Sequence, residues 1–250
     1  MKLVTLNTWC GRVRDKYKDF FDVYPHIDIW CFQEVFNNAD TYIDPVIDHS
    51  DADKKLLGTL QSYLKDFNVE FCQVLSNFYG IASFVNKNIE IIDRGEVLVA
   101  KGDWWNLTDT HNRDHHRKLQ WMELKINEKK VLIAHVHLTH RPEGKSDNKK
   151  RLQQSRIIAE FLNMFDCPKI LCGDFNLLPD TESIKIIEDA GMRNLVTEYK
   201  IPSTRTELYK KPLQFADYIF VSPEIQVNDF KVLPEVVSDH APLYIDFEIK

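Results

Sequence analysis

Short apolar strands separated by polar turns run through the whole chain, and this pattern constrains the fold more than any other feature. Eleven segments have strand character: Lys2 to Asn7, Ile27 to Phe32, Val69 to Leu75, Gly80 to Val85, Ile89 to Ala100, Lys118 to Ile126, Val131 to Leu138, Ile170 to Cys172, Ala216 to Val221, Ile225 to Leu233 and Leu243 to Ile249. Four segments have helical character: Asp15 to Tyr24, Asp53 to Phe67, Lys149 to Phe165 and Thr181 to Ala190. This many strands predicts two packed sheets with helices as outer layers, a layered α+β fold.

One pair of strands has a clear connection. The polar residues 127–130 separate the strands Lys118 to Ile126 and Val131 to Leu138, which predicts an antiparallel hairpin. Alternation along its second strand then puts His135 and His137 on one face of the sheet.

Composition bounds the class of protein. The 250 residues contain 8 Gly and 10 Pro without a linker or repeat, so we expect one domain over residues 1–250. No apolar run is as long as a membrane span and the start does not resemble a secretory signal, so we expect a cytoplasmic monomer without a membrane anchor. Five cysteines without paired spacing indicate reduced thiols. A net charge of −6 argues against bulk electrostatic coating of nucleic acid but leaves room for a local basic groove.

The tetrapeptide Gly173-Asp174-Phe175-Asn176 directly follows a short apolar strand. Alternation predicts that its carboxylate and carboxamide point to the same side, where they could serve chemistry. Asp and Asn are also common turn residues, and Asp180 is a helix-start signal. The tetrapeptide alone therefore leaves a plain turn open.

Other polar groups lie at or near strand ends: Asn7, Gln33-Glu34, Asp217 and Asp239-His240. Hard oxygen ligands suit Mg²⁺ or Mn²⁺, and Glu34 is the first choice among them. Phosphodiester cleavage needs a positioned water, a base and positive charge on the phosphate oxygens. Asp174, Asn176, His240 and a metal ion could supply these.

Seven short motifs occur in a specific order along the chain: Leu6-Asn7-Thr8-Trp9, Phe32-Gln33-Glu34-Val35, Tyr79-Gly80-Ile81-Ala82, His135-Val136-His137-Leu138, Gly173-Asp174-Phe175-Asn176, Asp217-Tyr218-Ile219-Phe220 and Ser238-Asp239-His240-Ala241-Pro242-Leu243. In this the chain resembles the endonuclease/exonuclease/phosphatase superfamily, which includes pancreatic deoxyribonuclease and the apurinic/apyrimidinic endonucleases. The resemblance spans almost the whole chain. It implies a four-layer αββα sandwich of two mostly antiparallel sheets, with the site at one end of both sheets.

The resemblance also implies roles for the matching residues. Glu34 would bind the metal with help from Asn7 and Asp239. Asp174 would orient or deprotonate the attacking water, and Asn176 would hold that water or a phosphate oxygen. His240, paired with Asp217, would stabilise the transition state, and His137 would contact phosphate or the leaving group.

His135 departs from the family pattern, because an Asn is common at that position. It could support the residues of the site from behind, or simply be buried in its strand.

The sequence leaves several interpretations open for the residues that would contact the substrate. Six of the nine histidines fall between His111 and His140, which admits a transition-metal site, although no carboxylate or cysteine completes a tetrahedral set. The pair Trp104-Trp105, beside Arg113 and Arg117, could stack a base or could cover a sheet edge. The basic cluster that contains Lys145 could reach phosphate or could merely begin a helix.

The sequence thus predicts a Mg²⁺- or Mn²⁺-dependent phosphoester hydrolase, with a phosphodiesterase or nuclease as the first choice. Inositol phosphates, phospholipids and small nucleotides are alternative substrates. A non-catalytic module that binds phosphate or nucleic acid is a second alternative, disfavoured because none of the expected site residues is missing.

Overall fold

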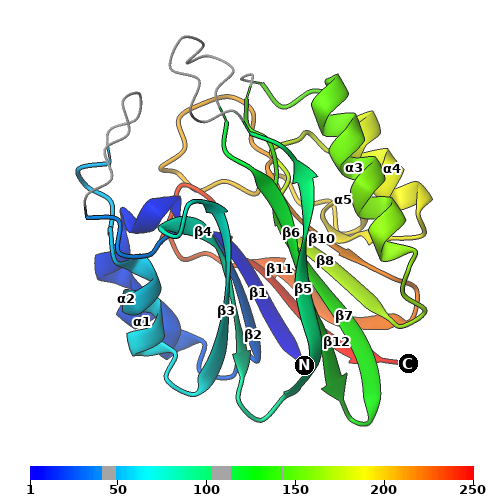
Figure 1. Ribbon diagram of the computed structural model, residues 1–250, viewed down its shortest axis with the longest axis horizontal. Helices are drawn as coiled ribbons and strands as arrows, with labels where there is room; N and C mark the ends of the chain where they lie inside the picture. Colours follow the sequence, from blue (N-terminus) through cyan, green and yellow to red (C-terminus); the bar gives the residue numbers. More distant parts are fainter. Residues whose placement is uncertain (41–48, 103–113, 142–143) are drawn as a thin grey trace.

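Two six-stranded sheets lie face to face, with helices on both outer sides (Figure 1). This computed structural model describes residues 1–40, 49–102, 114–141 and 144–250. Trp104, Trp105 and Arg113, which the sequence predicts as substrate contacts, lie outside the described residues. The layered αββα architecture predicted from the sequence is confirmed.

The first sheet has the order β11-β12-β1-β2-β4-β3. Only the β1–β2 pair is parallel. The bounds are β1 Lys2–Asn7, β2 Ile29–Phe36, β3 Phe67–Leu75, β4 Tyr79–Asn86, β11 Ile225–Val232 and β12 Leu243–Ile249.

The second sheet has the order β5-β6-β7-β8-β10-β9. Only β7 and β8 run parallel, and the predicted hairpin is the antiparallel pair β6–β7. The bounds are β5 Glu90–Ala100, β6 Arg117–Ile126, β7 Lys129–His137, β8 Lys169–Asp174, β9 Arg193–Asn194 and β10 Asp217–Val221.

Helices α1 and α2 cover the first sheet, while α3, α4 and α5 lie beside the second (Figure 1). The bounds are α1 Tyr17–Val23, α2 Leu56–Tyr63, α3 Lys149–Leu162, α4 Glu182–Asp189 and α5 Leu195–Glu198, with single 3₁₀ turns at Trp9–Gly11 and Arg14–Lys16. All four predicted helices and all eleven predicted strands are present. The two-residue β9 and the four-residue α5 were not predicted, because they are too short to show a periodic pattern. In the described residues, no helix is long and apolar enough to cross a membrane.

Alternation along the strands of the first sheet divides its residues between two cores. Leu3, Ile29 and Cys31 face the second sheet, while Val4 and Trp30 face α1 and α2. All five cysteines are free; four are buried and Cys167 is partly exposed. Both faces of this sheet are therefore covered, and polar side chains accumulate where the strands end.

Strand β2 contains an irregularity that the sequence does not reveal. Instead of ending at Phe32 it continues to Phe36, and its register against β4 shifts between Phe32 and Val35. Glu34 lies in this bulge with a φ of 58°, in the left-handed region that non-glycine residues seldom adopt. The prediction that Glu34 follows the strand was therefore wrong: it is displayed by a bulge within the strand.

Gly173 allows β8 to lie close to β7. Its φ is 129°, and a Cβ at this position would lie 2.0 Å from the carbonyl oxygen of Val136. Only glycine fits there without displacing the backbone, so this residue supports the sheet directly below Asp174.

Candidate active site

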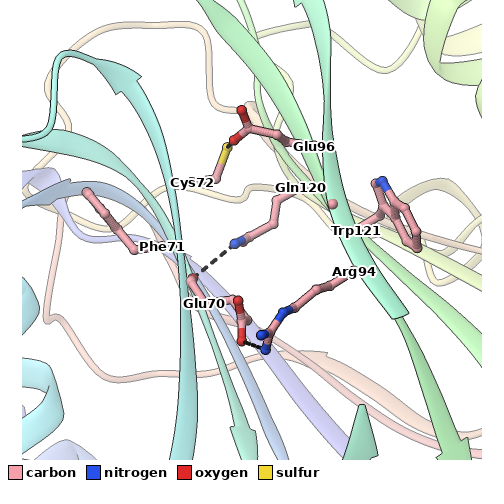
Figure 2. Close-up of a pocket in the computed structure, with 8 residues that line it drawn as sticks. Glu70, Phe71, Cys72, Arg94, Glu96, Gln120 and Trp121 are labelled. Carbon is pink, nitrogen blue, oxygen red and sulfur yellow. Dashed lines mark hydrogen bonds and ion pairs between the residues drawn. The ribbon is translucent and has the colours of Figure 1, made fainter. Parts of the chain in front are cut away.

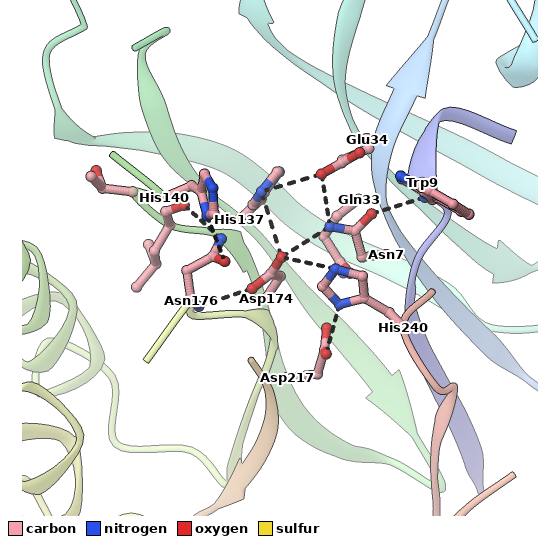
Figure 3. A network of polar contacts seen from close by, with 12 residues as sticks. Asn7, Trp9, Gln33, Glu34, His137, His140, Asp174, Asn176, Asp217 and His240 are labelled. Carbon is pink, nitrogen blue, oxygen red and sulfur yellow. Dashed lines mark hydrogen bonds and ion pairs between the residues drawn. The ribbon is translucent and has the colours of Figure 1, made fainter. Parts of the chain in front are cut away.

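Three neighbouring strands of the second sheet bring polar residues to one row. In the register of the sheet, Asp174 at the end of β8 lies opposite His137 on β7 and Asp217 on β10. On the facing sheet, Asn7 at the end of β1 lies opposite Gln33 on β2. The two rows meet in one network of polar contacts (Figure 3).

Asp174 is the centre of this network, and its residue is only 1% exposed. One carboxylate oxygen, Oδ2, accepts a hydrogen bond of 2.9 Å from Asn7 Nδ2, and Oδ1 accepts one of 2.9 Å from the backbone N–H of Asn176. The Nε2 atoms of His137 and His240 lie 3.6 Å and 3.8 Å from Oδ2. Burial acts to raise the pKa of Asp174, but His240, His137 and Lys145 outweigh it and hold this pKa well below its usual value. Asp174 is thus a carboxylate at neutral pH.

The sequence predicts that strand alternation brings Asn176 to the side of Asp174. This prediction was wrong, because β8 ends at Asp174. The hydrogen bond from the Asn176 N–H to Asp174 and a φ of 54° at Asn176 turn the chain back instead. Its side chain contacts the carbonyl oxygen of Leu138 and the Nδ1 atom of His140. The tetrapeptide therefore does form a turn, and this turn places Asn176 next to Asp174.

His240 and Asp217 form a buried pair. The distance from His240 Nδ1 to Asp217 Oδ2 is 2.7 Å. Burial, followed by the charge of Arg205, lowers the pKa of His240 to about 4, while burial and the charge of Asp174 raise the pKa of Asp217. With Nδ1–H donating to Asp217, the Nε2 atom of the neutral ring faces Asp174 and can exchange a proton.

Glu34 and Asp239 provide the carboxylates best suited to a divalent cation. Glu34 Oε1 accepts a hydrogen bond of 3.0 Å from Asn7 Nδ2, and its side chain is 23% exposed. Asp239 pairs with Arg205 at 2.9 Å through Oδ2, whereas its Oδ1 is buried without a hydrogen-bond partner. The pKa of Asp239 is raised, first by burial and also by the charges of Glu34 and Asp217. A cation would satisfy the unpaired oxygen and relieve this repulsion, so the residues fit Mg²⁺ or Mn²⁺.

Asn7, which the resemblance implies assists the metal ligand Glu34, lies between Glu34 and Asp174. Its Oδ1 accepts the N–H of Trp9 at 3.0 Å, so its amide nitrogen faces both carboxylates. In this orientation Asn7 is a hydrogen-bond donor that links the two carboxylates.

Asp174, Asp217 and His240 form a second group of possible metal ligands, apart from Glu34 and Asp239. In the described part of the chain, the one set of three or more His, Cys, Asp and Glu side chains close enough to share a metal consists of Asp174, Asp217 and His240. The short His240–Asp217 hydrogen bond already occupies two of these groups. We therefore interpret this set as a proton-transfer chain, and the tetrahedral histidine site considered from the sequence is not found among the described residues.

Two basic residues predicted to bind substrate, Lys145 and Arg117, are both buried but have different partners. Lys145 is 3% exposed and donates to the carbonyl oxygen of Phe215 at 2.6 Å. Burial and Arg205 lower its pKa to about 8, and the nearby carboxylates of Asp174 and Asp217 act in the opposite direction. It is a buried cation of the site rather than an exposed rim residue, and the cluster around it does begin a helix, α3.

Arg117 is also 3% exposed, but its guanidinium is held by Asp114 at 2.7 Å and by the carbonyl oxygen of His137 at 3.4 Å. This arrangement supports the end of β7 instead of leaving the guanidinium for a substrate.

The Asp114–Arg117 pair provides a test of stability. Burial would raise the pKa of Asp114, but the charges of Arg117, His115 and Lys150 hold it well below its usual value. Because the folded-state pKa is depressed, the pair stabilises the fold above the unfolded-state pKa of about 3.9 and loses this effect as the pH falls further. We expect Asp114→Asn to lower the free energy of unfolding at pH 7 by roughly 3 kcal/mol. In denaturant titrations, the gap to the wild type should be constant above about pH 5, begin to narrow near pH 4 and narrow further as the pH falls toward the depressed folded-state pKa.

The matched control for that variant is Asp22→Asn, which breaks the exposed Lys18–Asp22 pair. It should leave the unfolding midpoint unchanged across this pH range. A gap for Asp114→Asn that persists undiminished at pH 3 would contradict the assignment to a charged pair.

Two residues near the site were missed in the sequence. Arg205, whose side chain is 5% exposed, lies in an irregular segment and carries no motif, yet it pairs with Asp239 and lies over the Tyr209 ring at 4.1 Å. His140 contacts Asn176, and burial lowers its pKa to about 4. Its position just after the strand of His137 was the one available signal.

Comparison with known proteins identifies the family of this chain. A family model described as Endonuclease/Exonuclease/phosphatase family matches residues 4–240. No curated protein matches in sequence.

Solved structures extend the likeness over the full chain. A family protein of Bacteroides thetaiotaomicron has a TM-score of 0.75 at 16% identity, covering 99% of this chain and 97% of its own. A mannosyl-6-phosphatase of the same organism has a TM-score of 0.74 at 16% identity, with both chains fully covered. The catalytic domain of human Nocturnin with bound sulfate has a TM-score of 0.71 at 19% identity, covering 100% and 93%. At these identities the likeness concerns the fold.

Proposed function

We propose, from the premise that this chain belongs to the endonuclease/exonuclease/phosphatase family, that it is a divalent-metal-dependent hydrolase which cleaves a phosphodiester by direct attack of water. Proteins of this family are generally phosphoester hydrolases. The observation that carries the proposal is the position of Asp174, a buried carboxylate in contact with Asn7, Asn176, His137 and His240 at once.

Asp174 is suited to handle the attacking water. Its depressed pKa keeps it ionised, and it accepts hydrogen bonds from Asn7 and Asn176 that fix both oxygens. A fixed carboxylate can orient a water molecule and accept its proton as the new bond to phosphorus forms. The side chain of Asn176, on the adjoining turn, would hold this water or a phosphate oxygen.

His137 and His240 lie on either side of Asp174 and present Nε2 atoms to the space beside it. We assign them to the phosphate oxygens and the leaving group, where hydrogen-bond donors stabilise developing negative charge. Nε2 of the neutral His240 ring becomes such a donor once it has accepted the proton that Asp174 takes from water. Asp217 holds the ring of His240 in one orientation and favours hydrogen at Nδ1. No side chain needs to form a covalent intermediate in this scheme.

Glu34 and Asp239 would hold the metal ion, with Asn7 beside them. When bound, this ion supplies positive charge to the phosphate oxygens. Lys145 and Arg205 are cations near the site and partly balance the charges of its four carboxylates.

Substrate class is the open part of the proposal. We favour a nucleic-acid phosphodiester, whereas the similarity in fold to a mannosyl-6-phosphatase keeps a small phosphomonoester as the alternative. Inositol phosphates, sphingomyelin and small nucleotides are further alternatives. The net charge of −6 argues for recognition through local contacts instead of bulk attraction.

Metal removal is the first test of this function. We expect EDTA to reduce hydrolysis to background and Mg²⁺ or Mn²⁺ to restore it, because removal of the cation takes away the positive charge on the phosphate oxygens and leaves Asp239 Oδ1 without a partner. The purified protein would be assayed on abasic DNA, single-stranded DNA, RNA, inositol phosphates, sphingomyelin and p-nitrophenyl phosphate.

Undiminished hydrolysis in EDTA would contradict the metal-dependent mechanism. Turnover of p-nitrophenyl phosphate and inositol phosphates alone would select the phosphatase. Metal binding without turnover of any substrate would favour the non-catalytic binding module.

A further inference from the structure

A chain of buried hydrogen bonds crosses the space between the two sheets, behind the active site. It runs from Gln33 through His135 and Ser83 to Gln120, and the four residues are at most 5% exposed. The successive distances are 2.6 Å, 3.1 Å and 2.8 Å. At the far end, Gln120 donates to the carbonyl oxygen of Glu70 at 3.0 Å, within a polar pocket between β3 and β6 (Figure 2).

The direction of this chain is fixed from both ends. The amide nitrogen of Gln120 faces the Glu70 carbonyl, which can only accept, so its Oε1 must accept from the Ser83 hydroxyl. The oxygen of Ser83 is then left to accept a hydrogen bond from Nδ1–H of His135.

The other end gives the same answer. The amide nitrogen of Gln33 lies 3.2 Å from the carbonyl oxygen of Cys31, another group that can only accept. The Gln33 nitrogen is therefore a donor, and Nε2 of His135 must accept from it. The Ser83 end requires hydrogen on Nδ1 of His135. The Gln33 end agrees, because His135 Nε2 at 2.6 Å is the shortest of the three contacts, with Thr5 Oγ1 and the Cys31 carbonyl oxygen, that share the two amide hydrogens.

Gln33 directly precedes Glu34 in the bulge of β2. The hydroxyl of Thr8 contacts the carbonyl oxygens of Gln33 and Glu34 at 2.8 Å and 3.0 Å and holds the backbone on one side. On the other side, the Gln33 side chain is anchored between the sheets, even though its Oε1 is buried without a partner. An unfavourable left-handed backbone at Glu34 persists only where surrounding contacts determine it.

We propose that His135 is a positioning residue which, through Gln33, holds the bulge that aims Glu34 at the metal site. This rests on the proposed function only through the role of Glu34 as a ligand. A residue behind a metal ligand usually alters metal affinity about 10- to 100-fold when it is removed. His135→Leu is therefore expected to weaken Mn²⁺ binding at least tenfold, measured by calorimetry without substrate.

A matched pair of variants separates positioning from stability. Gln33→Met and Gln120→Met make the same change at the two ends of the chain of hydrogen bonds, and both should lower the melting temperature. Only Gln33→Met should also weaken Mn²⁺ binding, since Gln120 lies three hydrogen bonds away from Gln33. Imidazole ¹⁵N shifts of the wild type should report hydrogen on Nδ1 of His135.

Unchanged Mn²⁺ affinity in His135→Leu would overturn the proposal. If that variant does not fold, equal affinities of Gln33→Met and Gln120→Met would overturn it instead. A wild type that binds neither Mn²⁺ nor Mg²⁺ would contradict the proposed function itself, which is a different result from a wild type that binds and a variant that binds equally well.

Discussion

Replacing Asp174 with asparagine is expected to lower kcat by about three orders of magnitude, the middle of the range for loss of a general base. The variant keeps the shape of the side chain but loses the charge that accepts the proton of water. It also turns an amide nitrogen toward one of two existing donors, Asn7 or the Asn176 N–H. The measurement is steady-state hydrolysis of the best phosphodiester substrate with saturating Mg²⁺.

The control for this variant is Asp180→Asn, which removes an exposed carboxylate six residues further along the chain. Its kcat should equal that of the wild type. The melting temperature of Asp174→Asn should fall, because the amide nitrogen meets a buried donor and the nearby cationic groups lose their carboxylate, so kcat is compared well below that temperature. If Asp174→Asn kept a tenth of wild-type activity, Asp174 would not be the residue that activates water.

Disruption of the His240–Asp217 pair should have the second largest effect. We expect His240→Gln to lower kcat by about 10²- to 10³-fold and Asp217→Asn by about 10- to 100-fold. The asparagine can donate to Nδ1 and so favour hydrogen on the wrong ring nitrogen, whereas the glutamine removes the imidazole altogether.

The double variant tests whether His240 and Asp217 act as one unit. Residues that act as one unit are not additive, so the double variant should be no slower than His240→Gln alone. Multiplication of the two single effects would show instead that Asp217 acts independently of His240, and the proposed pair would be rejected.

The sequence predicts most of the fold because two local patterns carry the information: the alternation of apolar residues and the polar residues near strand ends. Alternating apolar residues identify strands, as in β1 and β12, whose bounds agree with the prediction at both ends. The placement of Asp174 and Asp217 near strand ends was equally readable, and the structure brings them together with His137 in one row.

What the sequence does not reveal depends on backbone geometry or long-range pairing. The bulge at Glu34 arises from contacts to Thr8 and to the facing sheet, none of which is local. Arg205 gains its place only because its segment folds against the loop of Asp239 and His240. The sequence alone leaves open whether His135 supports the site or is simply buried, because its partners Ser83 and Gln33 lie on the facing sheet.

The row formed by His137, Asp174 and Asp217 has a consequence for how this protein can change over evolution or in the laboratory. A one-residue insertion within β7, β8 or β10 would keep an apolar strand but move Val136, Gly173 or Tyr218 into the row. Loops between the strands can lengthen or shorten without altering this alignment. Insertions and deletions should therefore be tolerated in the connections long before they are tolerated in these three strands, and libraries that vary loop length are the practical route to new substrates.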